Sequence, residues 1–169
     1  MNSLVSKISI ALALVLIAVP VWSIKPTVKI ITQESSPIII SSYSAEYKQG
    51  SRYVTEGIHH SVEYINTSKE RIVAVQIGLV SFDVWDEFLH RMNGLSIDDL
   101  APGSAKKATW IDHTYGDFSF LTGVAYVSKV RFDNGTIWSA DLNAIAEEIG
   151  EIEKNFSVEK LKEKTEGKD

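Results

Sequence analysis

The side chains that could bind a transition metal are the four histidines, His59, His60, His90 and His113. His59 and His60 are adjacent in a segment predicted to be a strand, where neighbouring side chains point to opposite faces. They therefore cannot chelate one ion together, and no other pair of histidines has the spacing of a zinc motif. The chain has no cysteine that could complete a ligand set. We expect no metal site and no cofactor.

Carboxylates and serines are the next candidates for chemistry. Asp83, Asp86 and Glu87 form one acidic group, and Asp98 and Asp99 form another. Neither group has the spacing of a calcium-binding EF-hand loop, so solvated loop charge is the simpler interpretation. No serine lies in a Gly-x-Ser-x-Gly elbow, and no glycine-rich phosphate loop is present. We predict no catalytic residues.

Trp85 is a candidate for binding rather than catalysis. It ends an apolar run and is followed by Asp86 and Glu87, so it is predicted at the mouth of a loop. An aromatic side chain in that place can contact a carbohydrate, a peptide or a partner protein. Packing into the core, as expected for Trp110 and Trp138, is the alternative.

The N-terminal segment has the pattern of a secretory signal peptide. Lys7 is its only charged residue, an apolar run extends from Ile8 to Trp22, and the small residue Ser23 suits cleavage. A membrane anchor is the alternative, but this run is shorter than the roughly 20 residues that usually span a bilayer. We therefore expect residues 1–23 to be removed, the mature chain to begin near Ile24, and no membrane insertion after cleavage.

Composition limits the location and the partners. The absence of cysteine favours a bacterial periplasm over a eukaryotic extracellular space, although both remain open for an exported protein. The net charge is −5, and lysine and arginine form no basic stripe. Binding to nucleic acid needs such a cluster, so nucleic acid is excluded as a partner.

The segments that must position these residues are mostly strands. Runs of β-branched and aromatic residues between turn-forming residues predict seven of them, at 37–47, 52–65, 71–85, 95–100, 106–112, 118–132 and 137–138. Residues 86–94 are predicted to be a polar loop with one helical turn. Segment 71–85 is apolar on both faces, so we expect it to be covered on both sides. The structure of the lead-in segment 24–36 is left open.

The clearest local signals lie near the C-terminus. Asn134-Gly135 predicts a type I′ turn between the last two strands. A stripe of apolar residues from Leu142 to Ile152 then predicts an amphipathic helix with Asp141 as its N-cap. The predicted domain comprises residues 37–154, and residues 155–169 form a short helix, with Ser157 as N-cap, and a charged tail.

These elements predict a mainly β fold, an immunoglobulin-like antiparallel β-sandwich of about seven strands with a C-terminal amphipathic helix. Residues 64–68 (YINTS), Phe82-Asp83 and residues 100–103 (LAPG) resemble the pattern of FxLyD-type immunoglobulin-like domains of exported prokaryotic proteins, over about Gly57 to Tyr126. The resemblance implies a sandwich used as an accessory or binding module. It also implies that there are no catalytic residues to carry over.

An antiparallel order of these strands gathers several loops at one end of the sandwich. Counting the reversals places loop 86–94, loop 113–117 and the start of the helix at Asp141 together. Loops held by rigid strands are where such folds usually bind. The predicted binding residues are accordingly Trp85, His90, Arg91, His113 and Tyr115.

The function expected from the sequence is that of an exported, non-enzymatic module. It would bind an unknown protein or a component of the cell envelope. The alternative is a small secreted hydrolase with its site in the same loops.

Overall fold

The computed structural model describes residues 25–113 and 119–162, so the predicted signal peptide, Tyr115 and most of the charged tail lie outside the described residues. Eight strands, one α-helix and one 3₁₀ helix form in this order: β1 (Thr27–Ile31), β2 (Ile38–Lys48), β3 (Gly57–Asn66), β4 (Ile72–Asp83), β5 (Phe88–Leu100), β6 (Ala105–Asp112), β7 (Phe120–Phe132), β8 (Ile137–Ser139), α1 (Leu142–Ile149) and η1 (Val158–Leu161).

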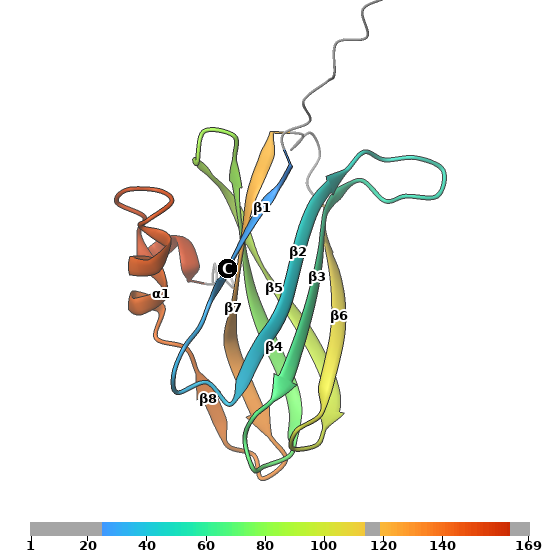
Figure 1. Cartoon of the computed structure of the whole chain (residues 1–169), viewed down its shortest axis with the longest axis vertical. Coiled ribbons are helices and arrows are strands. Elements are labelled where there is room, and N and C mark those ends of the chain that lie inside the picture. The colour runs from blue at the N-terminus through green and yellow to red at the C-terminus, as the bar shows by residue number, and fades with distance from the viewer. Residues whose placement is uncertain (1–24, 114–118, 163–169) are drawn as a thin grey trace, which may run out of the picture.

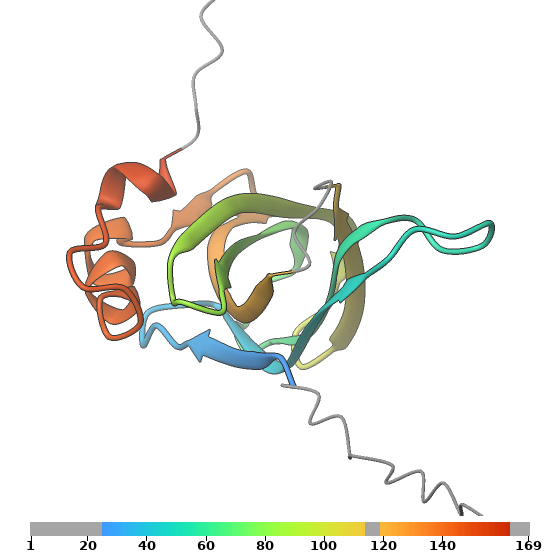
Figure 2. The same cartoon turned by 90° about the horizontal axis from the view of Figure 1, so that it is seen from above.

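The strands form two sheets that pack face to face (Figures 1 and 2). One sheet has the order β1-β7-β4-β5, with β8 also paired to β7, and the other has the order β2-β3-β6. All pairs are antiparallel except β1 with β7, which is parallel. The predicted mainly β, two-sheet arrangement is confirmed.

β4 shows why its sequence is apolar on both faces. Ile77 and Leu79 belong to the core between the two sheets. Val80 and Phe82 belong to a second core, in which α1 and η1 cover the outer face of the larger sheet. Burying a side chain of this size contributes about 1.5–3 kcal/mol. The molecule thus has three layers, with β4 and β7 in the middle one.

The prediction for residues 86–94 was wrong. β5 begins at Phe88 and pairs with β4 along its length, so His90 and Arg91 lie in a strand and not in a loop. The segment looked irregular because β5 is an edge strand of its sheet and mixes polar and apolar residues on both of its faces. Its backbone still pairs with β4, because a ladder of backbone hydrogen bonds does not depend on the side chains.

Two other boundaries differ from the prediction. The lead-in segment contains β1, which adds an eighth strand. Residues 52–56 are not part of the strand but of the long connection between β2 and β3, which projects sideways in Figure 1. The connection between β2 and β3 is mostly polar and contains one glycine, Gly50, so its sequence did not show where the pairing of the two strands ends.

The turn at Asn134-Gly135 is a hairpin turn but not type I′, which needs positive φ at both central residues. Gly135 has φ of 89°, whereas Asn134 is not among the residues with positive φ. Gly135 N–H donates to the Phe132 carbonyl, and Phe132 N–H donates to the Thr136 carbonyl. This is a three-residue loop, in which a type I turn is followed by glycine in the left-handed region.

The edges of the two sheets meet at β5 and β6, and side chains join them there. Trp110 of β6 lies over Gly94 of β5, where a Cβ would come within 2.4 Å of the indole ring. Its indole N–H donates to the Leu95 carbonyl at 3.2 Å. Near the start of β5 and at the end of β6, His90 pairs with Asp112. The sandwich is therefore closed on this side by side chains instead of a backbone ladder.

Candidate functional site

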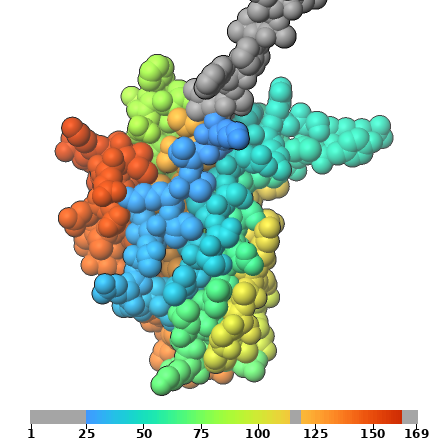
Figure 3. Space-filling model, viewed as in Figure 1, coloured from blue at the N-terminus to red at the C-terminus, as the bar shows by residue number. Residues whose placement is uncertain are grey.

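The end of the sandwich that carries the connections 49–56 and 84–87, here called the upper end, is the candidate binding surface (Figures 1 and 3). Two aromatic side chains project from it. Trp85 is 79% exposed and Tyr53 is 86% exposed. The alternative that Trp85 packs into the core is therefore wrong.

The turn that presents Trp85 has a defined geometry. Asp83 N–H donates to the Glu87 carbonyl, Asp86 N–H donates to the Asp83 carbonyl, and Asp86 has φ of 60°. The Asp83 carboxylate also accepts from the N–H groups of Trp85 and Glu87, at 2.8 and 2.9 Å. These bonds hold Val84 and Trp85 at the tip.

The connection that presents Tyr53 is a small turn of its own. Ser51 N–H donates to the Val54 carbonyl at 2.9 Å. The Ser51 hydroxyl accepts from the N–H groups of Tyr53 and Val54. The Arg52 guanidinium lies 5.6 Å from the centre of the Tyr53 ring, so the ring is partly covered by a cation.

His90 and His113 are brought to the upper end by different strands. His90 Nδ1 lies 2.8 Å from the Asp112 carboxylate, and both side chains are mostly buried. His113 follows Asp112 directly and is exposed. β5 runs away from the upper end and β6 runs toward it, so His90 near the start of β5 and His113 after β6 both lie at this end. The sequence analysis expected them at the same end.

Arg91 and the helix start do not belong to this group. Arg91 is paired with Val80, which faces the helical layer, so its side chain lies on the other face of β5 from His90. It donates to the Asn93 side chain at 3.1 Å. Asp141 lies beside the segment that follows β1, because β8 has only three residues and does not cross the sheet. The prediction that the start of the helix joins the upper end was wrong.

A buried polar pair, Tyr43 and His60, lies behind the upper end, between the sheets. The sequence analysis considered His60 only as a metal ligand and did not consider Tyr43. The hydroxyl of Tyr43 and Nδ1 of His60 are 2.9 Å apart and share a hydrogen bond. His60 is 1% exposed, and burial lowers its pKa to about 4, against opposition from the carboxylate of Asp112. Burial likewise raises the pKa of Tyr43. Both side chains are therefore neutral at pH 7. His60 shares strand parity with Ile58 and Val62, which was the available signal that it points inward.

Gly123 leaves room for this pair. A Cβ on Gly123 would lie 2.6 Å from the Tyr43 hydroxyl, so only glycine fits opposite it. β7 continues through this position without a break. His60 Nε2 has no hydrogen-bond partner in the described part of the chain.

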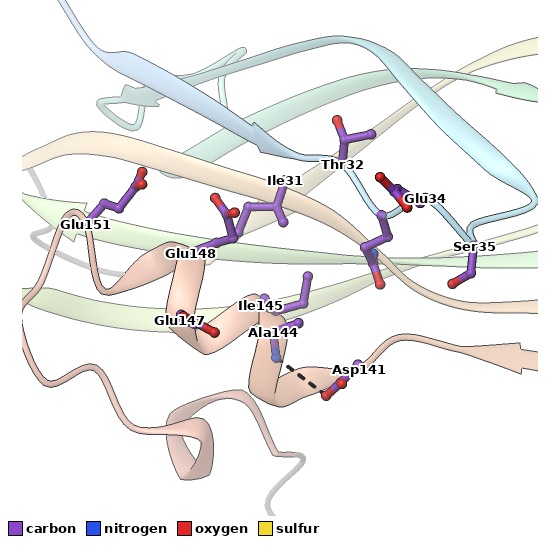
Figure 4. A pocket seen from close by; sticks show the side chains of 11 residues that line it. Ile31, Thr32, Glu34, Ser35, Asp141, Ala144, Ile145, Glu147, Glu148 and Glu151 are labelled. Carbon is purple, nitrogen blue, oxygen red and sulfur yellow. Dashed lines mark hydrogen bonds between the residues drawn. The ribbon is translucent and has the colours of Figure 1, made fainter.

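A separate groove of about 650 Å³ lies between α1 and the segment that follows β1 (Figure 4). Five carboxylates line it, from Glu34, Asp141, Glu147, Glu148 and Glu151. Lys29 forms ion pairs with Glu148 at 3.3 Å and with Glu151 at 2.5 Å. Asp141 caps α1 by accepting from the N–H groups of Asn143 and Ala144. Three of the five carboxylates, those of Asp141, Glu148 and Glu151, thus bind the helix N-terminus or Lys29.

Neither the upper end nor the acidic groove beside α1 is a metal centre among the residues described. Over 25–113 and 119–162, no group of three or more histidine, aspartate or glutamate side chains is placed to hold an ion. In the same ranges, no helix has the length and apolar character required to cross a membrane.

Comparisons with known proteins give a fold and no function. No family model and no curated protein matches the chain. A crystal structure of a hypothetical protein from Peptoclostridium difficile 630 is similar with a TM-score of 0.50 and 10% identity, over 67% of this chain and 91% of that one. The putative ApaA protein from Bordetella pertussis gives a TM-score of 0.39 and 14% identity, over 70% of this chain and 90% of that one. The first of these supports the two-sheet fold alone.

Proposed function

We propose that this protein is an exported, non-enzymatic binding module that engages a partner protein or a component of the cell envelope through its upper end. Its two-sheet fold would be an immunoglobulin-like sandwich of the FxLyD type, with the C-terminal helix as an added layer. Cleavage after Ser23 would release it into the periplasm or the extracellular space.

The observation that carries this proposal is the exposure of Trp85 and Tyr53 on two tightly hydrogen-bonded connections. Exposed tryptophan and tyrosine are the residue types that contribute most at binding surfaces. A connection whose backbone is already held by hydrogen bonds loses little conformational entropy on binding, which favours affinity. Strands on both sides of each connection keep the two tips in place.

A hydrolase at the same end is the second candidate, and the His90–Asp112 pair is the observation in its favour. A carboxylate that orients a histidine is one part of a general-base system. The reaction would also require a nucleophile beside His90. Hydrolysis of a panel of p-nitrophenyl esters that disappears in Asp112→Asn, while Trp85→Ala retains it, would favour this candidate.

Site-specific photo-crosslinking in cells of the native host tests the binding proposal. A benzophenone amino acid would replace Trp85 or Tyr53 and, as a control, the exposed Lys69 at the opposite end. We expect adducts from the first two positions and none from the third. Equal adducts from all three positions, or none from any, would contradict the proposal.

A further inference from the structure

The start of the described chain lies at the upper end. Thr27, the first residue of β1, is in register with Thr122 of β7, which is in register with Phe82 of β4. The hydroxyl groups of Thr27 and Thr122 are 2.9 Å apart. The described chain therefore begins at the level where β4 ends, directly before the 84–87 turn (Figure 1).

The residues that precede this point form an uncharged sequence. Between Lys7 and Lys25 lie 17 residues, Ile8–Ile24, without a charged side chain, and most of them are apolar. A signal peptide places such a run in a bilayer during export, and an anchor leaves it there. While this run is attached and in the bilayer, the upper end is the part of the domain that is closest to the membrane.

The 84–87 turn has apolar residues at its tip, although a turn of the same geometry elsewhere in the chain has polar residues there. Its hydrogen bonds repeat those of the Asn134-Gly135 turn, with one residue of positive φ closing a three-residue loop in each case. In the lower turn, the two tip positions are Asp133 and Asn134, polar residue types that are common in turns. In the upper turn, the same positions are Val84 and Trp85, which are 41% and 79% exposed.

The opposite end offers a second contrast. Its four connections, 32–37, 67–71, 101–104 and 133–136, contribute none of the large hydrophobic side chains that are exposed. Among the described residues, the exposed large hydrophobic side chains on connections all lie at the upper end, where the described chain begins: Tyr53, Val54, Val84 and Trp85.

We propose that the 84–87 turn rests in the headgroup region of a lipid bilayer, with Trp85 and Val84 as the contact residues. This inference rests on the proposed function, in which the upper end binds, and it names a lipid surface as the envelope component. Tryptophan is enriched at this depth of a membrane because its ring is apolar and its indole N–H is polar. Asp86 and Glu87 flank the tip, so a zwitterionic surface suits it better than an anionic one.

The lack of cysteine makes a direct test possible, since one introduced thiol is the only thiol in the chain. Val84→Cys and Asp133→Cys place that thiol at the matching tip position of the upper and lower turns. Each full-length variant would be labelled with a polarity-sensitive fluorophore and reconstituted into phosphatidylcholine vesicles. The readouts are the emission wavelength and the quenching by iodide, with and without lipid.

We expect the label at Val84 to shift to shorter wavelength and to lose most of its iodide quenching in vesicles, while the label at Asp133 changes in neither respect. Replacing Trp85 by Asn in the Val84→Cys chain should reverse most of that change. Unchanged emission at Val84, or equal protection of both labels, would overturn the lipid proposal. If Trp85 still forms photo-adducts with a protein in that case, the binding function stands with a protein partner.

Discussion

Acid should destabilise this protein through His60, and the size of the effect follows from its burial. Burial inside the sandwich lowers the pKa of His60 from 6.5 to about 4. The unfolded chain therefore takes up a proton near pH 6.5 that the folded chain does not accept until about pH 4. The stability associated with neutral His60 is fully present above pH 6.5, falls as the pH decreases through this window, and does not fall further below pH 4.

The magnitude is large enough to measure. A pKa difference of this size corresponds to about 3 kcal/mol in the free energy of unfolding. That is a substantial fraction of the roughly 5–15 kcal/mol by which folded domains are stable. The comparison is made between variants, so that only the contribution of residue 60 differs.

Urea unfolding of the wild type and of His60→Gln, followed by far-ultraviolet circular dichroism at pH 7 and at pH 4, isolates this contribution. Glutamine can keep the hydrogen bond with Tyr43 but does not titrate. We expect the wild type to lose about 3 kcal/mol more than His60→Gln between the two values of pH. His59→Gln, on the outer face of the same strand, is the control and should behave as the wild type does.

An equal loss in the wild type and in His60→Gln would refute the reasoning. A second measurement covers the case in which His60→Gln is too unstable to compare. The ring proton resonances of His60 should not shift in NMR spectra until the pH falls toward 4, and a midpoint near pH 6.5 would show that His60 is not held neutral.

Three substitutions test the packing of the fold, each by the free energy of unfolding in urea. Gly135→Val should cost about 1–3 kcal/mol, since φ of 89° strains a β-branched residue although the space around it is open; an unchanged midpoint would show that the turn adopts another conformation. Gly78→Ala should cost at least about 1–3 kcal/mol by overpacking, because its Cβ would lie 2.1 Å from the Tyr126 ring; a small cost would mean that the ring moves freely. Asn66→Ala should cost about 2–4 kcal/mol, because this buried amide donates to two carbonyls, one of them that of Leu100; a cost below about 1 kcal/mol would show that water replaces the amide.

Much of the β framework could be predicted from the sequence because it depends on local patterns. Alternating β-branched residues identified most of the segments that become strands, and apolar residues on both faces of 71–85 indicated a strand covered on each side. Asp141 was predicted as an N-cap, and its carboxylate does accept backbone N–H groups. In each case, residues close together in sequence carry the information.

Other features depend on residues that are far apart in the chain, and only the tertiary structure decided them. β1 forms because it pairs with β7, whose sequence lies about 95 residues away in the chain. β5 is a strand because β4 offers it a backbone ladder, which no side-chain pattern in 86–94 reveals. The direction of each side chain then followed from this pairing, so that His90 meets Asp112 between the sheets while Arg91 faces the helical layer.

For the candidate site, the sequence predicted Trp85 as a binding residue but did not determine whether its side chain is exposed. Its exposure depends on where β4 stops and on the bonds that Asp83 makes within the turn. Tyr53 was missed because it was assigned to a strand, and strand ends are set by pairing partners instead of by composition. The residue types of this protein thus determined which segments are apolar and β-prone, whereas the pairing of distant strands determined which of those side chains remain at the surface.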